Sequence, residues 1–310
     1  RPGGARPQTQ VMVDFIDRQR GEYGVEPICK ELPIAPSTYH AAKAARADPA
    51  RRSDRARRDE ALCAEIQRIF DDNFGVYGVR KVWEALKREG RVVARCTVAR
   101  LMQQLGLKGV VRGATTRTTR PAPMQALPDD RVRRHFRAEA PNRLWVADFT
   151  YVATWRGFAY TAFVIDTFAD LIVGWRTSNS MRTGLVLDAL EQALSARSTG
   201  DSLIHHSDRG TQYVSIRYTE RLRQVGIEPS VGSTGDSYDN ALAESVIGLY
   251  KTEVIHRRGP WRTPGEVEYA TLEWVDWFNN RRLLSSIGYV PPVEFEQAYY
   301  RKNDGQALAA

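Results

Sequence analysis

The chain has 310 residues, of which 42% are hydrophobic and 26% charged, and its formal net charge is +8 at pH 7. No run approaches the roughly 20 apolar residues of a membrane span, and the opening stretch RPGGARPQTQ lacks the apolar core of a signal peptide. These features exclude a membrane or signal-directed secreted protein and predict a cytoplasmic one. Because the chain does not begin with Met, we expect processing, trimming or an origin as the downstream part of a longer product.

The charge is distributed unevenly along the chain. Residues 1–140 hold 28 Lys and Arg against 17 Asp and Glu, a balance of +11, whereas residues 141–310 hold 17 against 20, a balance of −3. A basic front half can be an ordinary solvated surface. An excess of this size favours a partner that is a polyanion, and we expect nucleic acid.

Cysteine and histidine are scarce. The three cysteines are Cys29, Cys63 and Cys96, an odd number at wide spacing that predicts reduced, mostly buried thiols rather than disulfides. With five histidines, no Cys/His cluster has the spacing of zinc ligands, so a zinc module is not expected.

The front of the chain reads as helical. Residues 1–50 predict a helix-turn-helix-like DNA-binding segment, in which prolines make the spacing irregular. Residues 51–110 predict a second such domain, with a clear helix pair between Tyr77 and Gly106. Arg100 in the second helix of that pair would face DNA. The alternative is a helical bundle whose outer faces are merely basic.

A change of rhythm separates the two halves. Residues 111–143 mix Gly, Thr, Pro and Arg without periodicity and predict a basic linker, in which Arg112 and Arg117 would lie along phosphates. Residues 144–260 then predict a mixed five-stranded sheet with flanking helices, and residues 261–310 a C-terminal helical extension. We expect strands at 144–154, 158–167, 171–178, 202–208 and 227–231, and helices at 182–197, 214–226 and 238–257.

Three acids stand where the predicted layout gives them no structural role. Asp148 lies inside the first strand, Asp208 ends the fourth strand, and Glu244 lies near the start of the third helix of the core. Their carboxylates would repel one another in a shared cleft, and divalent cations would relieve that repulsion. A ligand set of oxygens suits Mg²⁺ or Mn²⁺, and two such ions support phosphodiester chemistry.

Polar residues near these acids predict contacts with DNA. Asn240, Glu244 and Lys251 fall at i, i+4 and i+11 on one helical face, which would present an amide, a carboxylate and an ammonium to the cleft. Arg209 and Gln212 follow Asp208 and either contact DNA or only shape the loop.

Two further groups have open interpretations. We interpret Asp166, at the end of the second strand, as a carboxylate that supports the site or a turn. His206 either forms a hydrogen bond within the loop or contacts a metal ion.

At these residues the chain resembles a transposase of the retroviral-integrase superfamily that uses an acidic triad of two Asp and one Glu. It is most similar to the second-frame product of bacterial insertion sequences that move by a copy-out, paste-in route. The matching stretches are NRLWVADFTYV, IHHSDRGTQY, SVGSTGDSYDNALAESVIGLYKTE and WVDWFNNRRLLSSIGYVPPVEFE, within about 142–296, preceded by YGVRKVWEALKREG and LMQQLGL.

The resemblance implies an RNase H-like catalytic core with Asp148, Asp208 and Glu244 as catalytic metal ligands. It implies two Mg²⁺ ions, for which Mn²⁺ substitutes, cleavage at 3′ ends by water, and joining by direct attack of the freed 3′-hydroxyl. Lys251 is implied in binding the element's terminal inverted repeat. The resemblance also implies fusion to an upstream-frame DNA-binding partner. Joining two ends requires at least a dimer.

Two features depart from the family. Leu284 stands where relatives often carry His, so we assign it no role, and the chain lacks the zinc module of retroviral integrases. Two other functions remain open, an RNase H-like nuclease that hydrolyses without joining and a catalytically silent DNA-binding repressor. A catalytically silent repressor would be expected to have lost one of the three acids, and all three are present. The basic helical front half favours an enzyme that holds particular DNA ends.

Overall fold

The computed structural model describes residues 7, 9–111, 138–198, 202–208, 212–213, 215–231 and 241–307. The chain divides into two compact units, Arg1–Gln67 and Arg68–Ala310. None of the helices in the described part combines the length and apolar character that a membrane crossing needs. The domain boundaries predicted from the sequence stay predictions.

The first unit is helical and has a small core of its own. Asp17 organises its charged side, because the Tyr39 hydroxyl donates to it at 2.7 Å and the Lys43 ammonium at 3.0 Å. These hydrogen bonds lower the pKa of the Asp17 carboxyl. The core of the first unit contains the buried residues Met12, Val13, Ile16, Ile28, Cys29, Ile34 and Tyr39. Its elements are α1 (Thr9–Tyr23), α2 (Val25–Glu31), α3 (Pro36–Ala47), η1 (Pro49–Arg51) and the first part of α4 (Asp54–Asp72).

The second unit begins with the end of α4 and a helix pair, α5 (Val79–Arg88) and α6 (Arg95–Gln104). The pair predicted from the sequence is confirmed, and its contact is built from Val82 and Leu86 on α5 and Val98, Leu101 and Met102 on α6, all buried. Leu105 is 37% exposed, because it lies past the end of α6 as its C-cap.

A five-stranded mixed sheet follows, as predicted, in the order β3-β2-β1-β4-β5. Strand β1 pairs antiparallel with β2 and parallel with β4, which in turn pairs parallel with β5. The remaining pair, β2 with β3, is antiparallel and has an irregularity between Val164 and Ile165. The strands are β1 (Leu144–Thr154), β2 (Gly157–Asp166), β3 (Leu171–Ser178), β4 (Ile204–Ser207) and β5 (Glu228–Val231).

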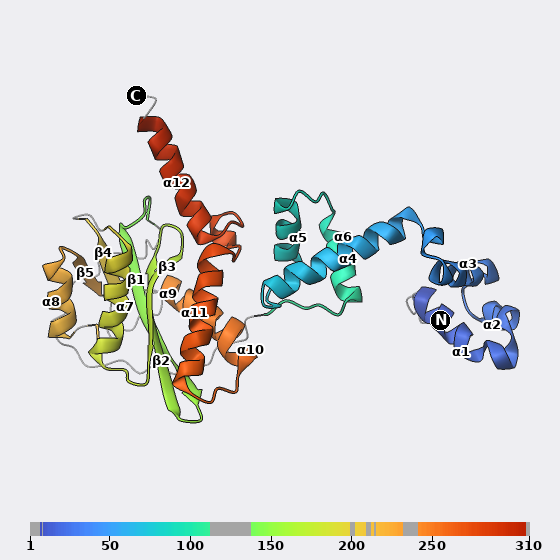
Figure 1. Cartoon of the computed structure of the whole chain (residues 1–310), viewed down its shortest axis with the longest axis horizontal. Coiled ribbons are helices and arrows are strands. Elements are labelled where there is room, and N and C mark those ends of the chain that lie inside the picture. The colour runs from blue at the N-terminus through green and yellow to red at the C-terminus, as the bar shows by residue number, and fades with distance from the viewer. Residues whose placement is uncertain are drawn as a thin grey trace, which may run out of the picture. The chain divides into compact units, whose positions relative to one another are not determined.

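Helices cover both faces of the sheet (Figure 1). One face, which includes Ala147 and Val164, packs against α7 in the main hydrophobic core. On the other face, Phe163 lies against the rings of Tyr250 and Trp274, which belong to α9 and α11. The helices of this part are α7 (Thr183–Ala196), α8 (Ile216–Gln224), α9 (Ala241–Tyr250), α10 (His256–Arg258), α11 (Pro264–Asn280) and α12 (Pro292–Ala307), with short turns η2 (Lys251–Ile255) and η3 (Ser285–Ile287).

The segment after α4 docks on the end of α11. The indole of Trp277 donates to the Asn73 side chain at 3.0 Å and lies edge-on to Phe74 at 5.2 Å between ring centroids. The buried hydroxyl of Tyr77 accepts from the backbone N–H of Leu283 at 2.8 Å. Leu284, the departure from the family pattern, is buried beside this contact, where its backbone pairs with Val290.

The helix predicted over 238–257 is interrupted. After α9, residues Lys251–Ile255 form a π-helical turn, and α10 completes the element. The turn brings Glu253 inside, where it is 4% exposed, and there it receives hydrogen bonds from Arg282 and from the Trp274 indole. The guanidinium of Arg282 compensates the negative charge of the Glu253 carboxylate, which would otherwise make its burial unfavourable.

None of the three cysteines, all within the described residues, forms a disulfide, as predicted. The expectation that they are mostly buried is wrong, because only Cys29 is buried, while Cys63 is half-buried and Cys96 is exposed. Cys96 lies in the first turn of α6, whose buried face begins at Val98.

A glycine sets the distance between α7 and the sheet. A Cβ at Gly174 of β3 would collide with the Ala189 carbonyl oxygen and press on the Ala193 side chain. We therefore expect Gly174→Ala to lower the thermal unfolding midpoint by about 2–10 °C, because overpacking a core costs about 1–3 kcal/mol. The matched control is Gly184→Ala, where a Cβ meets nothing within 4 Å. Equal midpoints for both variants, measured by circular dichroism, would contradict this account.

Lys81 on α5 gives the docked segment a pH dependence. Its ammonium lies 5.2 Å from the centroid of the Tyr77 ring, and burial, followed by the charge of Arg282, lowers the Lys81 pKa to about 7. The folded chain therefore binds fewer protons than the unfolded chain between this value and the ordinary one, so its stability rises with pH across that window.

We expect the unfolding midpoint to rise between pH 7 and pH 9, and Lys81→Met to increase the midpoint at pH 7 and reduce the rise. Lys87→Met, a control at an exposed position of the same helix, should keep the wild-type slope. Thermal melts at a series of pH values measure this. A Lys81→Met slope equal to that of the wild type would refute it.

Candidate active site

The register of two parallel strands brings two of the predicted acids together. Ala147 of β1 pairs with Ser207 of β4, so Asp148 and Asp208 follow the same pair on adjacent strands. Neighbouring strands lie about 4.8 Å apart. Both carboxylates are half-buried, which leaves each a route to solvent or to a ligand.

The third acid comes from α9, which packs on β1 (Figure 1). Ala243, Val246, Ile247 and Tyr250 form the buried side of this helix, while Glu244 in its first turn is exposed. The apolar face of α9 thus fixes the helix, and Glu244 stays available at its N-terminal end.

Electrostatics connects these groups. Burial and the negative charge of Asp208 raise the pKa of Asp148 well above its usual range, and Glu244 raises it further. The backbone N–H of Phe149, which donates to Asp148 at 2.7 Å, and the charge of Lys251 oppose this rise in pKa. Asp208 and Glu244 are therefore close enough to disfavour the ionisation of Asp148, and a bound cation would relieve this repulsion.

Lys251 stands where α9 gives way to the π-helical turn. Its ammonium lies 5.7 Å from the centroid of the Tyr151 ring, on the strand that carries Asp148. π-helical turns inside α-helices occur frequently at functional sites. The predicted triad and the predicted lysine thus converge on the middle of β1.

The polar residues beside Asp208 have structural partners. His206 exchanges a hydrogen bond with the Ser230 hydroxyl of β5 at 2.9 Å, and His205 one with the Tyr218 hydroxyl at 3.0 Å. Burial, followed by the charge of His206, lowers the His205 pKa to about 3, so that imidazole is neutral. The observed hydrogen bond of His206 is to a strand rather than within the loop, and its contact with a metal ion stays a prediction.

Sequence reasoning missed Tyr213. Its hydroxyl is buried without a hydrogen-bond partner among the described residues, five positions after Asp208. Burial, and after it the charge of Asp148, raises the Tyr213 pKa, so the group stays protonated beside the carboxylates. The aromatic residue that ends the IHHSDRGTQY stretch was the only sequence feature that indicated it.

The predicted DNA-contacting residues are only partly described. Arg100 is half-buried on α6 and donates to Gln104 at 3.3 Å, and the Gln212 carbonyl accepts from Ser215 at the start of α8. The remaining predictions lie outside the described residues, at Arg112, Arg117, Arg209 and Asn240.

Asp166 has the supporting role that we expected of a turn carboxylate. It accepts hydrogen bonds from the backbone N–H groups of Asn142 and Phe168, at 2.7 and 3.0 Å, and pairs with Arg197 at 3.4 Å. Burial nevertheless raises its pKa. It therefore fixes the turn that precedes β1 against the turn that follows β2.

The donor set fits a hard divalent cation. Asp148, Asp208 and Glu244 offer only carboxylate oxygens, the ligands that Mg²⁺ and Mn²⁺ prefer. Among the described residues no group of three Asp, Glu, His or Cys lies close enough to hold one ion together in this conformation. The fit therefore rests on the ligand chemistry and on the raised pKa of Asp148, which a nearby cation would reverse.

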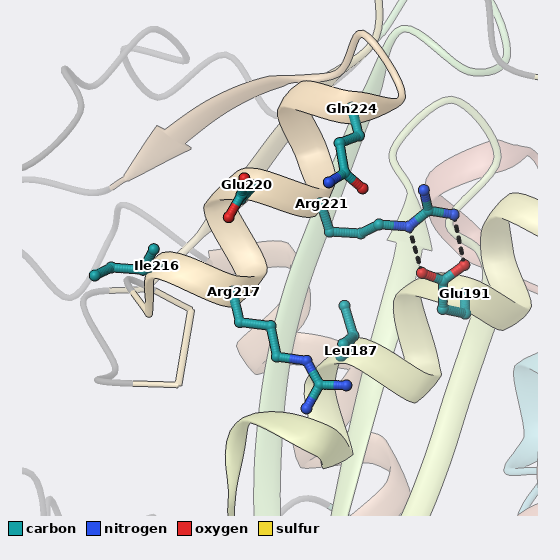
Figure 2. A pocket seen from close by; sticks show the side chains of 7 residues that line it. All are labelled: Leu187, Glu191, Ile216, Arg217, Glu220, Arg221 and Gln224. Carbon is teal, nitrogen blue, oxygen red and sulfur yellow. Dashed lines mark hydrogen bonds and ion pairs between the residues drawn. The ribbon is translucent and has the colours of Figure 1, made fainter.

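A surface pocket between α7 and α8 is a separate feature (Figure 2). Arg221 reaches across it and donates to both carboxylate oxygens of Glu191, the longer hydrogen bond measuring 2.9 Å. None of the predicted site residues within the described ranges lines it. The lining residues are Leu187, Glu191, Ile216, Arg217, Glu220, Arg221 and Gln224.

Comparison with known families places these features together. Residues 138–237 and 225–292 each match a model of an integrase core domain, and residues 57–115 match a model of an HTH-like domain. The first two matches cover the sheet and the helices that carry the candidate site. With the observed strand order, they confirm the predicted RNase H-like integrase core.

Relatives match over most of their length. The transposase for insertion sequence element IS629 of Shigella sonnei is 58% identical over 299 residues, covering 96% of this chain and 100% of that protein. The transposase for insertion sequence element IS3411 of Escherichia coli is 59% identical over 186 residues, covering 60% of this chain and 77% of that protein. The transposase for IS904 of Lactococcus lactis is 34% identical over 241 residues, covering 77% of this chain and 94% of that protein. The chain belongs to the family of insertion-sequence transposases that carry an integrase core domain.

Proposed function

We propose that this transposase cuts and joins DNA strands at Asp148, Asp208 and Glu244. The observation that carries the proposal is the raised pKa of Asp148, caused by burial and by the charges of the other two acids. Such a concentration of carboxylates is unfavourable for folding and is retained where a cation or phosphate chemistry requires it. Family membership supports DNA as the substrate and strand transfer as the reaction.

Asp148, Asp208 and Glu244 would hold two Mg²⁺ ions, for which Mn²⁺ would substitute. When bound, two such ions activate the attacking oxygen and stabilise the leaving one in a phosphodiester exchange. The chain's contribution is to position the ligands. Parallel strands fix Asp148 beside Asp208, and the apolar face of α9 fixes the helix whose first turn carries the exposed Glu244.

Lys251 would bind a phosphate of the element's end. Its ammonium is placed by the π-helical turn near the Tyr151 ring, and its charge acts on Asp148. Further contacts to terminal inverted repeats or target DNA would come from Arg100, Arg112, Arg117, Arg209, Gln212 and Asn240. The helices in residues 1–50 and 51–110 would dock DNA, with the linker at 111–143 along its phosphates.

The assembly would contain at least two copies of the chain, because two DNA ends have to be held together for joining. We also propose an upstream-frame DNA-binding partner or fusion, and a cytoplasmic location in contact with the nucleoid. The alternatives, a nuclease that only hydrolyses and a silent repressor, are less favoured, since the relatives are transposases and all three acids are present.

Glu244→Gln tests the triad. It removes a metal ligand at an exposed position, so we expect cleavage and joining to fall roughly 1000-fold or more, while affinity for the DNA end changes less than about threefold. The measurement uses a labelled duplex that carries the element's inverted repeat, with Mg²⁺ or EDTA, and sizes both nicked and joined strands.

Glu220→Gln is the matched control, because Glu220 is an exposed glutamate on α8. It should retain wild-type cleavage and joining. Wild-type rates for Glu244→Gln would remove Glu244 from the triad. Nicks without joined strands in the unaltered protein would instead favour the hydrolytic nuclease.

A further inference from the structure

An exposed aromatic strip lies on the outer part of the β1–β2 hairpin. Residues 152–159 of this hairpin extend beyond the paired parts of β3 and β4, and apart from a bridge between Thr154 and Trp261 they pair with each other (Figure 1). Tyr151 is 52% exposed, Trp155 70% and Phe158 49%. We call these three residues the hairpin platform. Large aromatic side chains at this exposure are unfavourable in water unless a ligand covers them.

The hairpin platform is held rigidly. The turn is closed by the Thr154 hydroxyl, which donates to the Gly157 carbonyl at 2.8 Å and accepts from the Arg156 backbone N–H at 3.2 Å. The Trp155 backbone N–H also donates to the Trp261 carbonyl at 3.0 Å, which ties the tip to the segment before α11. Tyr151 and Phe158 meet edge to face, with 5.7 Å between ring centroids. The rings are therefore ordered before any ligand arrives.

Cations accompany the rings. The Lys251 ammonium lies 5.7 Å from the Tyr151 ring and the Arg262 guanidinium 5.7 Å from the Trp155 ring, while Arg156 is exposed at the tip. Within the described part of the chain, none of these three cations has an ion pair with a carboxylate. The surface thus combines aromatic faces with positive charge, of which the Lys251 charge also acts on Asp148.

The combination of aromatic rings and cations on the hairpin platform indicates which kind of ligand binds there. Aromatic faces alternating with cations bind nucleic acid whose bases are out of the double helix, because a base stacks on the ring while its phosphates meet the cations. Aromatic and arginine side chains also occur in protein–protein interfaces, but lysine is depleted there, whereas a phosphate backbone can pair with Lys251, Arg156 and Arg262 together. The charge therefore favours DNA over a second copy.

The position of the strip relative to the triad sets its role. Tyr151 is three residues along β1 from Asp148, or about 10 Å at the rise of a strand, and because side chains alternate between the two faces of a strand their side chains do not share a face. Lys251 connects them, because its ammonium lies 5.7 Å from the centroid of the Tyr151 ring and its charge acts on Asp148. We propose that the hairpin platform stacks unpaired bases of the DNA strand next to the phosphate that reacts at Asp148. The inference deepens the proposed function and rests on it.

The test measures binding without chemistry. Fluorescence anisotropy in EDTA compares two probes of one element end, one fully paired and one with four mismatched base pairs beside the scissile phosphate. We expect the wild type to bind the mismatched probe roughly 5- to 100-fold more tightly, the effect of one or two stacked bases. Trp155→Leu and Phe158→Leu should lose most of this preference, while Trp155→Phe, which keeps a ring, should retain it.

Tyr300→Leu is the control, an aromatic residue of α12 that is 44% exposed. It should keep the wild-type preference. Equal binding of the two probes by the wild type, or an equal loss on both probes in Trp155→Leu, would overturn the inference. So would a change in self-association of Trp155→Leu without DNA, measured by sedimentation, because the strip would then serve a second copy.

The two proposals fail in different ways. Joined products together with no preference for the mismatched probe would remove the hairpin platform and leave the proposed function intact. A preference that disappears in Trp155→Leu, together with an unaltered protein that never joins strands in Mg²⁺, would support the platform and contradict strand transfer.

Discussion

The parallel pairing of β1 with β4 is the constraint on which the site depends. The register of Ala147 against Ser207 places Asp148 beside Asp208, against the repulsion that raises the Asp148 pKa. A slip by one residue would turn the carboxylates to opposite faces of the sheet. The register is held by a core that packs α7 closely on one face and α9 with α11 on the other. That packing keeps Asp148 and Asp208 adjacent although their carboxylates repel each other.

The element that follows Glu244 links the site to the rest of the second unit. Its π-helical turn presents Lys251 to β1 and, two residues on, buries Glu253 against Arg282. Arg282 immediately follows Arg281, whose backbone carbonyl accepts a hydrogen bond from the Tyr77 hydroxyl. This hydrogen bond belongs to the contact by which the segment after α4 docks on α11. Loss of one partner of a buried ion pair is strongly destabilising. The position of α9 and the docking of the segment after α4 therefore depend on the same few residues.

Much of this was predictable from local pattern. Strand β1 begins and ends where it was predicted, at Leu144 and Thr154, and the three acids were recognised because the predicted layout gave their carboxylates no structural role. The π-helical turn, the buried Tyr213 hydroxyl and the Trp277 docking contact were missed. Each depends on residues far apart in the chain, such as Asn73 with Trp277, and periodicity carries no information about such pairs. The hairpin platform was also not predicted, because Arg262 and Trp155 are distant in the sequence and come together only in the folded chain.

The central claim is that the carboxylates of β1, β4 and α9 share divalent cations. It is tested most directly by Mn²⁺ binding to the full chain on its DNA end, followed by electron paramagnetic resonance of the free ion. The account predicts binding that Asp148→Asn weakens at least about tenfold, as loss of a ligand requires. The control is Asp188→Asn, an exposed aspartate of α7, which should bind as the wild type does. Equal Mn²⁺ affinity for Asp148→Asn and the wild type would contradict the account.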